Sequence, residues 1–239
     1  MIRGFLTGLL FAAALCATPA ARAQVLTPAQ KDEVRGMIRD YIKENPEVVE
    51  EALSELQRRK DADLRRRIEG DPRDFATGPR NAPVTIVEFF DYRCPYCHAA
   101  MDWVFEVVRR NPQKVRVIFK EFPVLGPESL VASKALLASI RQGRYQPFHR
   151  AVMGFRGDLT AAQIDALARS AGVDVARMHR DMDDPAILDH LQANHDLAGE
   201  ARIEGTPAFV INGAWVRGWD KAEADRILAA ALRTSRQRK

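Results

Sequence analysis

The sequence predicts an α/β fold with a helical insert, preceded by an N-terminal helical stalk. Residues 84–90 (VTIVEFF) form an apolar run rich in β-branched and aromatic residues, which is typical of a strand buried on both faces. A helical pattern from about residue 97 to 110 separates this run from a second one at 115–119. Strand, helix and strand in this order favour a right-handed crossover between parallel strands.

The N-terminus has the layout of a cleavable secretory signal over residues 1–23. An arginine near the start precedes an apolar run at 5–15, and Ala21-Arg22-Ala23 precedes Gln24. The apolar run is too short to span a bilayer. We therefore expect cleavage between Ala23 and Gln24 and export to the periplasm.

Export changes both the charge and the thiol content of the chain. Cleavage removes two arginines and no acid, so the formal net charge falls from +4 to +2, which argues against nucleic-acid binding. It also removes Cys16, which leaves Cys94 and Cys97 as the remaining thiols. Disulfides persist in an exported compartment, so these two cysteines pair with each other or with the thiols of a partner.

Residues 24–75 are predicted to form the stalk. Apolar residues between 34 and 42 follow helical spacing, and Asn45-Pro46 resembles the start of a second helix with a thin apolar stripe. The stripe is too narrow to make a core alone. Prolines and glycines near residues 70–83 mark the boundary with a domain at 76–239.

The second half of this domain alternates helices with a hairpin. Residues from about 127 to 203 are almost entirely helical in pattern and form the predicted insert. Residues 208–211 and 215–216, joined through Asn212-Gly213, indicate a β-hairpin. A last helix is expected from about 221 to 232.

The two cysteines stand in a C-x-x-C pattern between the first strand and its helix. A structural zinc site usually needs four ligands, and the histidines of the insert lack ligand spacing to this single pair, so we expect no metal and no other cofactor. A disulfide that closes so short a loop also constrains the unfolded chain very little. Redox exchange therefore explains the pair best.

The position of the pair assigns a role to each cysteine. The unpaired N–H groups and the dipole at a helix N-terminus stabilise a thiolate at Cys94, which we assign as the attacking thiol. Pro95 fits the first helical turn because it has no N–H, and Tyr96 completes the active-site dipeptide. Cys97 lies one turn further along and is assigned as the resolving thiol.

Glu88 is out of place in an otherwise apolar strand, because an unpaired carboxylate is costly to bury. One interpretation is a proton relay, in which a carboxyl with a raised pKa takes the proton of Cys97 during resolution. The alternative is a structural ion pair with Lys120, at the end of the neighbouring strand. The two interpretations are compatible.

Two motifs in this order resemble a known family. FFDYRCPYC and the later EGTPAFVING, separated by a long helical segment, are similar to the DsbA-like branch of thioredoxin-fold proteins, over about residues 82–232. The resemblance implies a thioredoxin fold and a cis peptide bond between Thr206 and Pro207, where a substrate strand binds. Glu88 also falls where many relatives carry a buried acid.

The stalk resembles the N-terminal extension of ScsC-like proteins, in which such helices bring several copies together. This resemblance implies a homo-oligomer formed through residues 25–75. The alternative is a helical pair folded onto its own domain.

Three functions remain open from the sequence. The first is a protein disulfide oxidase that acts on unfolded secreted proteins and is reoxidised by a membrane partner of the DsbB type. The second is an oligomeric isomerase or reductase that acts on misoxidised proteins and is kept reduced by a partner of the DsbD type. The third is a non-enzymatic chaperone or copper-binding protein.

Overall fold

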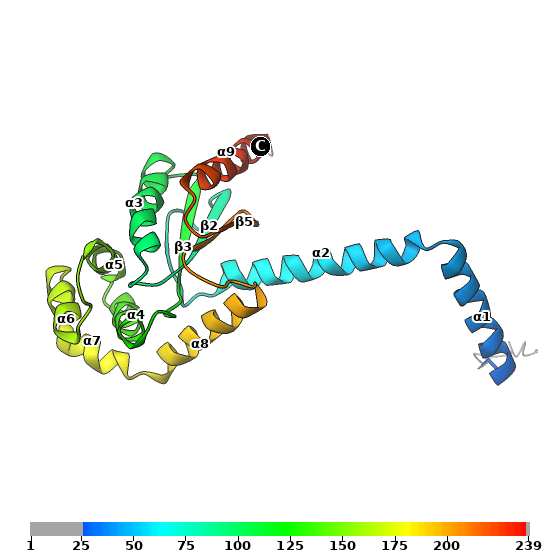
Figure 1. Ribbon diagram of the computed structural model, residues 1–239, viewed down its shortest axis with the longest axis horizontal. Coiled ribbons are helices and arrows are strands. Elements are labelled where there is room, and N and C mark those ends of the chain that lie inside the picture. Colours follow the sequence, from blue (N-terminus) through cyan, green and yellow to red (C-terminus); the bar gives the residue numbers. More distant parts are fainter. Residues whose placement is uncertain (1–25, 238–239) are drawn as a thin grey trace, which may run out of the picture. The chain divides into compact units, whose positions relative to one another are not determined.

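The computed structural model describes residues 26–237 (Figure 1). The predicted signal peptide and Cys16 lie outside the described residues. The chain divides into two compact units between Glu55 and Leu56. The second unit therefore begins about twenty residues before the boundary that the sequence indicates at residue 75, because the end of the stalk helix is packed into its core.

The first unit consists of helix α1 (Pro28–Glu44) and the first part of helix α2 (Glu47–Gly70). Thr27 caps α1: its hydroxyl accepts from the backbone of Gln30, whose side chain accepts from the backbone of Thr27. No residue of α1 is buried. The helices are confirmed, and their exposed apolar side chains include Met37, Ile38, Tyr41, Ile42, Val48, Val49 and Leu53.

The second unit is built around a five-stranded sheet with the order β1-β3-β2-β4-β5. Its strands are β1 (Phe75–Thr77), β2 (Val84–Phe90), β3 (Val115–Glu121), β4 (Ala208–Ile211) and β5 (Ala214–Arg217). Strands β2 and β3 are parallel and connected through helix α3 (Pro95–Arg110), as the sequence predicts. The predicted hairpin is β4–β5. The sequence did not reveal β1, whose three residues are too few to show a period.

Alternation along the central strands divides the core into two clusters. Ile86 and Phe90 of β2 pack with α3 and with α9 (Lys221–Gln237) on one face. Val87 and Phe89 face the other side, where Ile68 of α2 and residues of α8 (Pro185–Glu200) cover the sheet. Burial of Ile68 attaches the last turns of α2 to the second unit.

The predicted helical insert is confirmed and comprises five helices between β3 and β4 (Figure 1). They are α4 (Pro127–Ile140), α5 (Tyr145–Gly154), α6 (Ala161–Ser170), α7 (Val175–Met182) and α8. Helices α4 to α7 contact one another, and α5 also contacts α3. The insert thereby contacts the helix that carries the cysteines.

Candidate active site

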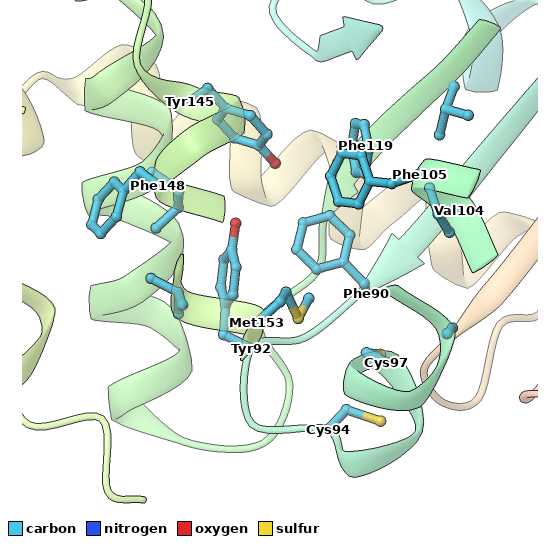
Figure 2. Packing of buried hydrophobic residues seen from close by; sticks show 14 of the residues in the cluster. Phe90, Tyr92, Cys94, Cys97, Val104, Phe105, Phe119, Tyr145, Phe148 and Met153 are labelled. Carbon is cyan, nitrogen blue, oxygen red and sulfur yellow. The ribbon is translucent and has the colours of Figure 1, made fainter. Parts of the chain in front are cut away.

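Cys94 and Cys97 lie at the N-terminus of α3, at the carboxyl end of the central strand β2 (Figure 2). Cys94 is the N-cap residue in an extended conformation, and Pro95 occupies the first turn as predicted. Both residues are buried, with exposed fractions of 3% for Cys94 and 1% for Cys97. Tyr96 between them is 63% exposed.

The environment of Cys94 stabilises its thiolate. The pKa of Cys94 falls to about 5, chiefly because the Cys97 side chain donates a hydrogen bond to its sulfur, assisted by the Thr206 side chain and the backbone N–H groups of Cys97 and Tyr96. Together these donors outweigh burial, which acts in the opposite direction. The Thr206 carbonyl oxygen, 3.1 Å from the sulfur, favours the protonated thiol instead.

Cys97 has the opposite character. Burial raises the pKa of this thiol far above its ordinary value, and the hydrogen bond to Cys94 and the charge of Glu88 add to the effect. At neutral pH the reduced pair therefore holds one thiolate, at Cys94, and one proton, at Cys97. This asymmetry agrees with the roles that the sequence assigns.

Glu88 lies on the same face of the sheet as the cysteines. Its exposed fraction is 2%, and no hydrogen bond or ion pair reaches its carboxyl from residues 26–237. Burial raises the pKa of Glu88 to about 8, with a further contribution from the negative charge of Cys94. The carboxyl can therefore hold a proton at neutral pH and release it just above.

The predicted ion pair between Glu88 and Lys120 is wrong, because the two side chains lie on opposite faces of the sheet. Glu88 stands opposite Phe119 in the β2–β3 register, whereas Lys120 stands opposite Phe89 and points to the other face. Lys120 Nζ lies instead 2.6 Å from Asp74 Oδ2, in the segment before β1. The sequence did not indicate Asp74 as the partner of Lys120, because the strand that follows Asp74, β1, was not predicted.

Thr206 and Pro207 form the opposite wall of the site. Their peptide bond is cis, as the resemblance implies, and β4 begins directly after it. A groove of about 600 Å³ runs beside them, and its lining includes Tyr96, Arg217 and Trp219. The structure thus brings Cys94, Cys97, Glu88, Thr206 and the dipeptide together and leaves Lys120 apart.

Sequence reasoning missed a buried polar cluster behind the cysteines. It consists of Tyr92, Glu121, Tyr145 and His149, all of them buried. The acid at the end of the second apolar run was the one signal that could have revealed it. Within residues 26–237 no three histidine, cysteine, aspartate or glutamate side chains gather as metal ligands would.

Two protein families match parts of this chain. The DSBA-like thioredoxin domain matches residues 85–231, and the copper resistance protein ScsC N-terminal domain matches residues 30–62. A thioredoxin-like oxidoreductase from Silicibacter pomeroyi is 36% identical, with 72% of this chain and 98% of that chain covered and a TM-score of 0.67. A linker-deletion variant of ScsC from Proteus mirabilis is 29% identical, with 89% and 100% covered and a TM-score of 0.67.

Curated relatives are longer proteins. The Na(+)/H(+) antiporter NhaA 1 of Salinispora arenicola is 31% identical over 162 residues, which are 67% of this chain and 24% of that protein. The chain thus spans about a quarter of the length of the curated relatives it matches. No helix within residues 26–237 is long and apolar enough to cross a membrane. On the family match over residues 85–231, this chain belongs to the DSBA-like thioredoxin family.

Proposed function

We propose that this protein is an exported thiol–disulfide oxidoreductase that forms disulfide bonds in secreted proteins. The observation that carries the proposal is the asymmetry of the two thiols, with the pKa of Cys94 near 5 and that of Cys97 far above its ordinary value. A cysteine pair that serves only packing has no need of it.

In the proposed cycle, a substrate thiolate attacks the Cys94 sulfur of the Cys94–Cys97 disulfide. A mixed disulfide forms, the bond to Cys97 breaks, and Cys97 takes up a proton. A second substrate thiolate then attacks the substrate sulfur of the mixed disulfide and releases Cys94 as a thiolate. The substrate loses two electrons and the enzyme gains them, so a membrane partner of the DsbB type must remove them again.

Glu88 is the proposed source of the Cys97 proton. Its raised pKa and its position beside Cys97 let it donate during formation of the mixed disulfide and accept in the reverse step. Glu88→Gln keeps the shape of the side chain and removes the titratable proton. We expect both steps to slow by about tenfold or more.

The low pKa of Cys94 also favours the oxidising direction. A stabilised thiolate stabilises the reduced enzyme and makes the enzyme disulfide a stronger oxidant. Thr206 and Pro207 are proposed to bind the substrate chain next to the disulfide, with Tyr96 and the adjacent groove contacting its flanking residues.

The test is oxidation of a reduced, unfolded secreted protein by the full chain in its disulfide form. We expect stoichiometric loss of substrate thiols and complete loss of this activity in Cys94→Ser. Retention of the protein's cellular function in Cys94→Ser would instead support a chaperone or copper-binding role.

A second candidate function is that of an oligomeric isomerase kept reduced by a DsbD-type partner. The observation that favours it is the unburied α1 helix with its exposed apolar residues, together with the match of residues 30–62 to the ScsC N-terminal domain. Exposed apolar surface of this kind is typical of association between chains.

The two candidates can be separated by restoring activity to a test enzyme with mispaired disulfides in a glutathione buffer. Leu53 is 61% exposed, so Leu53→Glu disrupts association without opening a core, and Ser54→Glu adds the same charge beside it as a control. Isomerisation that is lost, along with oligomer mass, in Leu53→Glu alone would favour the isomerase. Equal, fast oxidation by both variants without isomerisation would favour the oxidase.

A further inference from the structure

The segment that leads into Cys94, residues 91–94, is called the cysteine segment. Buried polar groups attach it to the rest of the fold. The Asp91 carboxylate, which is fully buried, accepts hydrogen bonds from the backbone N–H groups of Arg93 (2.7 Å), Val124 (2.8 Å) and Leu125 (2.9 Å). It also accepts one from the Ser129 hydroxyl of α4, at 2.7 Å. The backbone N–H of Cys94 donates to the carbonyl of Asp91, at 3.1 Å.

Tyr92, the next residue, is held at both ends. Its hydroxyl oxygen lies 2.9 Å from Glu121 Oε1 and 2.9 Å from His149 Nδ1. Its backbone carbonyl oxygen lies 2.6 Å from His98 Nε2, on the first turns of α3. In Figure 2 the ring points away from the cysteines, and its hydroxyl faces that of Tyr145. The residue thus connects the cysteine segment with β3 and with α5 of the insert.

The hydrogen atoms at Tyr92 can be assigned from its neighbours. Burial lowers the pKa of His149 to about 3, so its imidazole is neutral and can donate from Nδ1 to the Tyr92 oxygen. The Tyr92 hydroxyl then donates to Glu121 Oε1, which also accepts from the Tyr145 hydroxyl at 2.7 Å. All four of these hydrogen-bonded side chains are buried, and hydrogen bonds in such surroundings hold their geometry firmly.

We propose that Tyr92 is a positioning residue for Cys94, a role that rests on the proposed function. The Cys94 thiolate depends on donors from Tyr96, Cys97 and Thr206, and hydrogen bonds weaken steeply when their angles change. The Tyr92 hydroxyl sets where the backbone enters α3 and thereby aims the Cys94 sulfur at these donors. No step in disulfide exchange passes through Tyr92 itself.

Tyr145 provides a matched control. Its hydroxyl donates to the same oxygen of Glu121, and its side chain is as fully buried as that of Tyr92. Removal of either hydroxyl takes one donor from Glu121 and leaves a phenyl ring in the core. Tyr145, however, belongs to α5 and does not lead into the cysteine segment.

The experiment measures the Cys94 pKa from thiolate absorbance at 240 nm in the reduced full chain. Cys16→Ser is present in every variant, so that Cys94 and Cys97 are the only thiols. We expect Tyr92→Phe to raise the Cys94 pKa by about half a unit or more, and to slow alkylation at pH 5 by about twofold or more. Tyr145→Phe should leave both values at those of the parent protein.

Other results for the Cys94 pKa would count against either the proposed function or the role of Tyr92. If the parent protein has no thiolate below pH 7, the proposed function fails at its central observation. If the parent has a low Cys94 pKa but Tyr92→Phe and Tyr145→Phe shift it equally, or neither does, the positioning role of Tyr92 is overturned and the proposed function stands.

A second pair of variants keeps the proposal testable if Tyr92→Phe does not fold. Glu121→Gln retains an acceptor oxygen for Tyr92, whereas Glu121→Leu fills a similar volume without one. We expect the Cys94 pKa to stay at the parent value in Glu121→Gln and to rise in Glu121→Leu. Equal Cys94 pKa values in the two variants would contradict a role for the hydrogen bond.

Discussion

Buried ionisable groups lie on both faces of the β2–β3 strand pair, but among the described residues Glu88 on one face lacks the charged partners that Asp74 has on the other. On the face that packs against α3, the Glu88 carboxyl has no hydrogen-bond or ion-pair partner among residues 26–237, and its pKa is raised to about 8. On the opposite face, Asp74 Oδ2 lies 2.6 Å from Lys120 Nζ, and Asp74 Oδ1 lies 2.8 Å from His190 Nε2. All four side chains are almost completely buried.

This difference separates a charged group that holds the fold together from an ionisable group that can take part in the reaction. A buried ion pair fixes the position of the segments it joins, here β3, α8 and the segment before β1. An unpartnered carboxyl forms no stabilising contact, but its proton can be exchanged near neutral pH. We therefore expect changes on the first face to alter reactivity and changes on the second to alter stability.

The largest effect should come from Cys94→Ser, on the reactive face. A serine hydroxyl is not ionised at neutral pH and forms no mixed disulfide, so the oxidation rate should fall by about a thousandfold or more. Near pH 4, where Cys94 is protonated in both the folded and the unfolded state, the free energy of unfolding of the reduced protein should change little, which circular dichroism in urea would check. Residual oxidation within about tenfold of the parent would mean that Cys94 does not form the mixed disulfide with the substrate.

The largest effect on stability should come from Lys120→Met, on the opposite face. The change leaves Asp74 buried without its cation and should lower the free energy of unfolding by about 3–5 kcal/mol. The Cys94 pKa and the rate of alkylation should stay unchanged, because Lys120 points away from the cysteines. A changed Cys94 pKa in the folded variant would break the division between the faces.

The sequence predicted the reactive face better than the structural one. Cys94, Cys97 and Glu88 lie in one short stretch whose chemistry can be argued locally, and the role of Pro207 is implied by the family resemblance. The pairing of Lys120 failed because its partner precedes β1, a strand too short to show periodicity. Side chains 46 residues apart along the chain meet there through strand register alone.

The same reason explains why the cluster around Tyr92 was missed. Its members come from the cysteine segment, β3 and α5, and each is an ordinary core residue when taken singly. The extent of the domain was similarly obscured, because α2 continues without a break from the first unit into the second. Composition changes along α2 only gradually, whereas burial begins with Leu64 and Ile68.

His190→Leu tests how complete the structural network must be. Asp74 keeps its cation but loses one hydrogen bond, so the free energy of unfolding should fall by about 1–3 kcal/mol, less than in Lys120→Met. Thermal unfolding of both variants and of the double variant would show the coupling. A loss in His190→Leu as large as that in Lys120→Met would mean that the histidine, rather than the lysine, is the main partner of Asp74.

Glu88→Gln should have almost no effect on stability at pH 5. The folded protein holds the Glu88 proton more tightly than the unfolded chain, because burial raises the pKa from 4.5 to about 8. The resulting stabilisation is therefore complete below pH 4.5 and is lost as the pH rises through 8. Glutamine resembles the protonated acid and does not titrate, so the variant should become the more stable protein by about 1–3 kcal/mol near pH 8.5.

The oxidised protein is the form in which to measure this difference, since the Cys94 thiolate, which also raises the Glu88 pKa, is then absent. Contributions from His149 and Glu121 are common to both proteins and cancel in the comparison. A difference between the two proteins that stays constant from pH 5 to 8.5 would mean that Glu88 is ionised throughout. Glu88 would then be a structural charge like Asp74, and the contrast between the two faces would disappear.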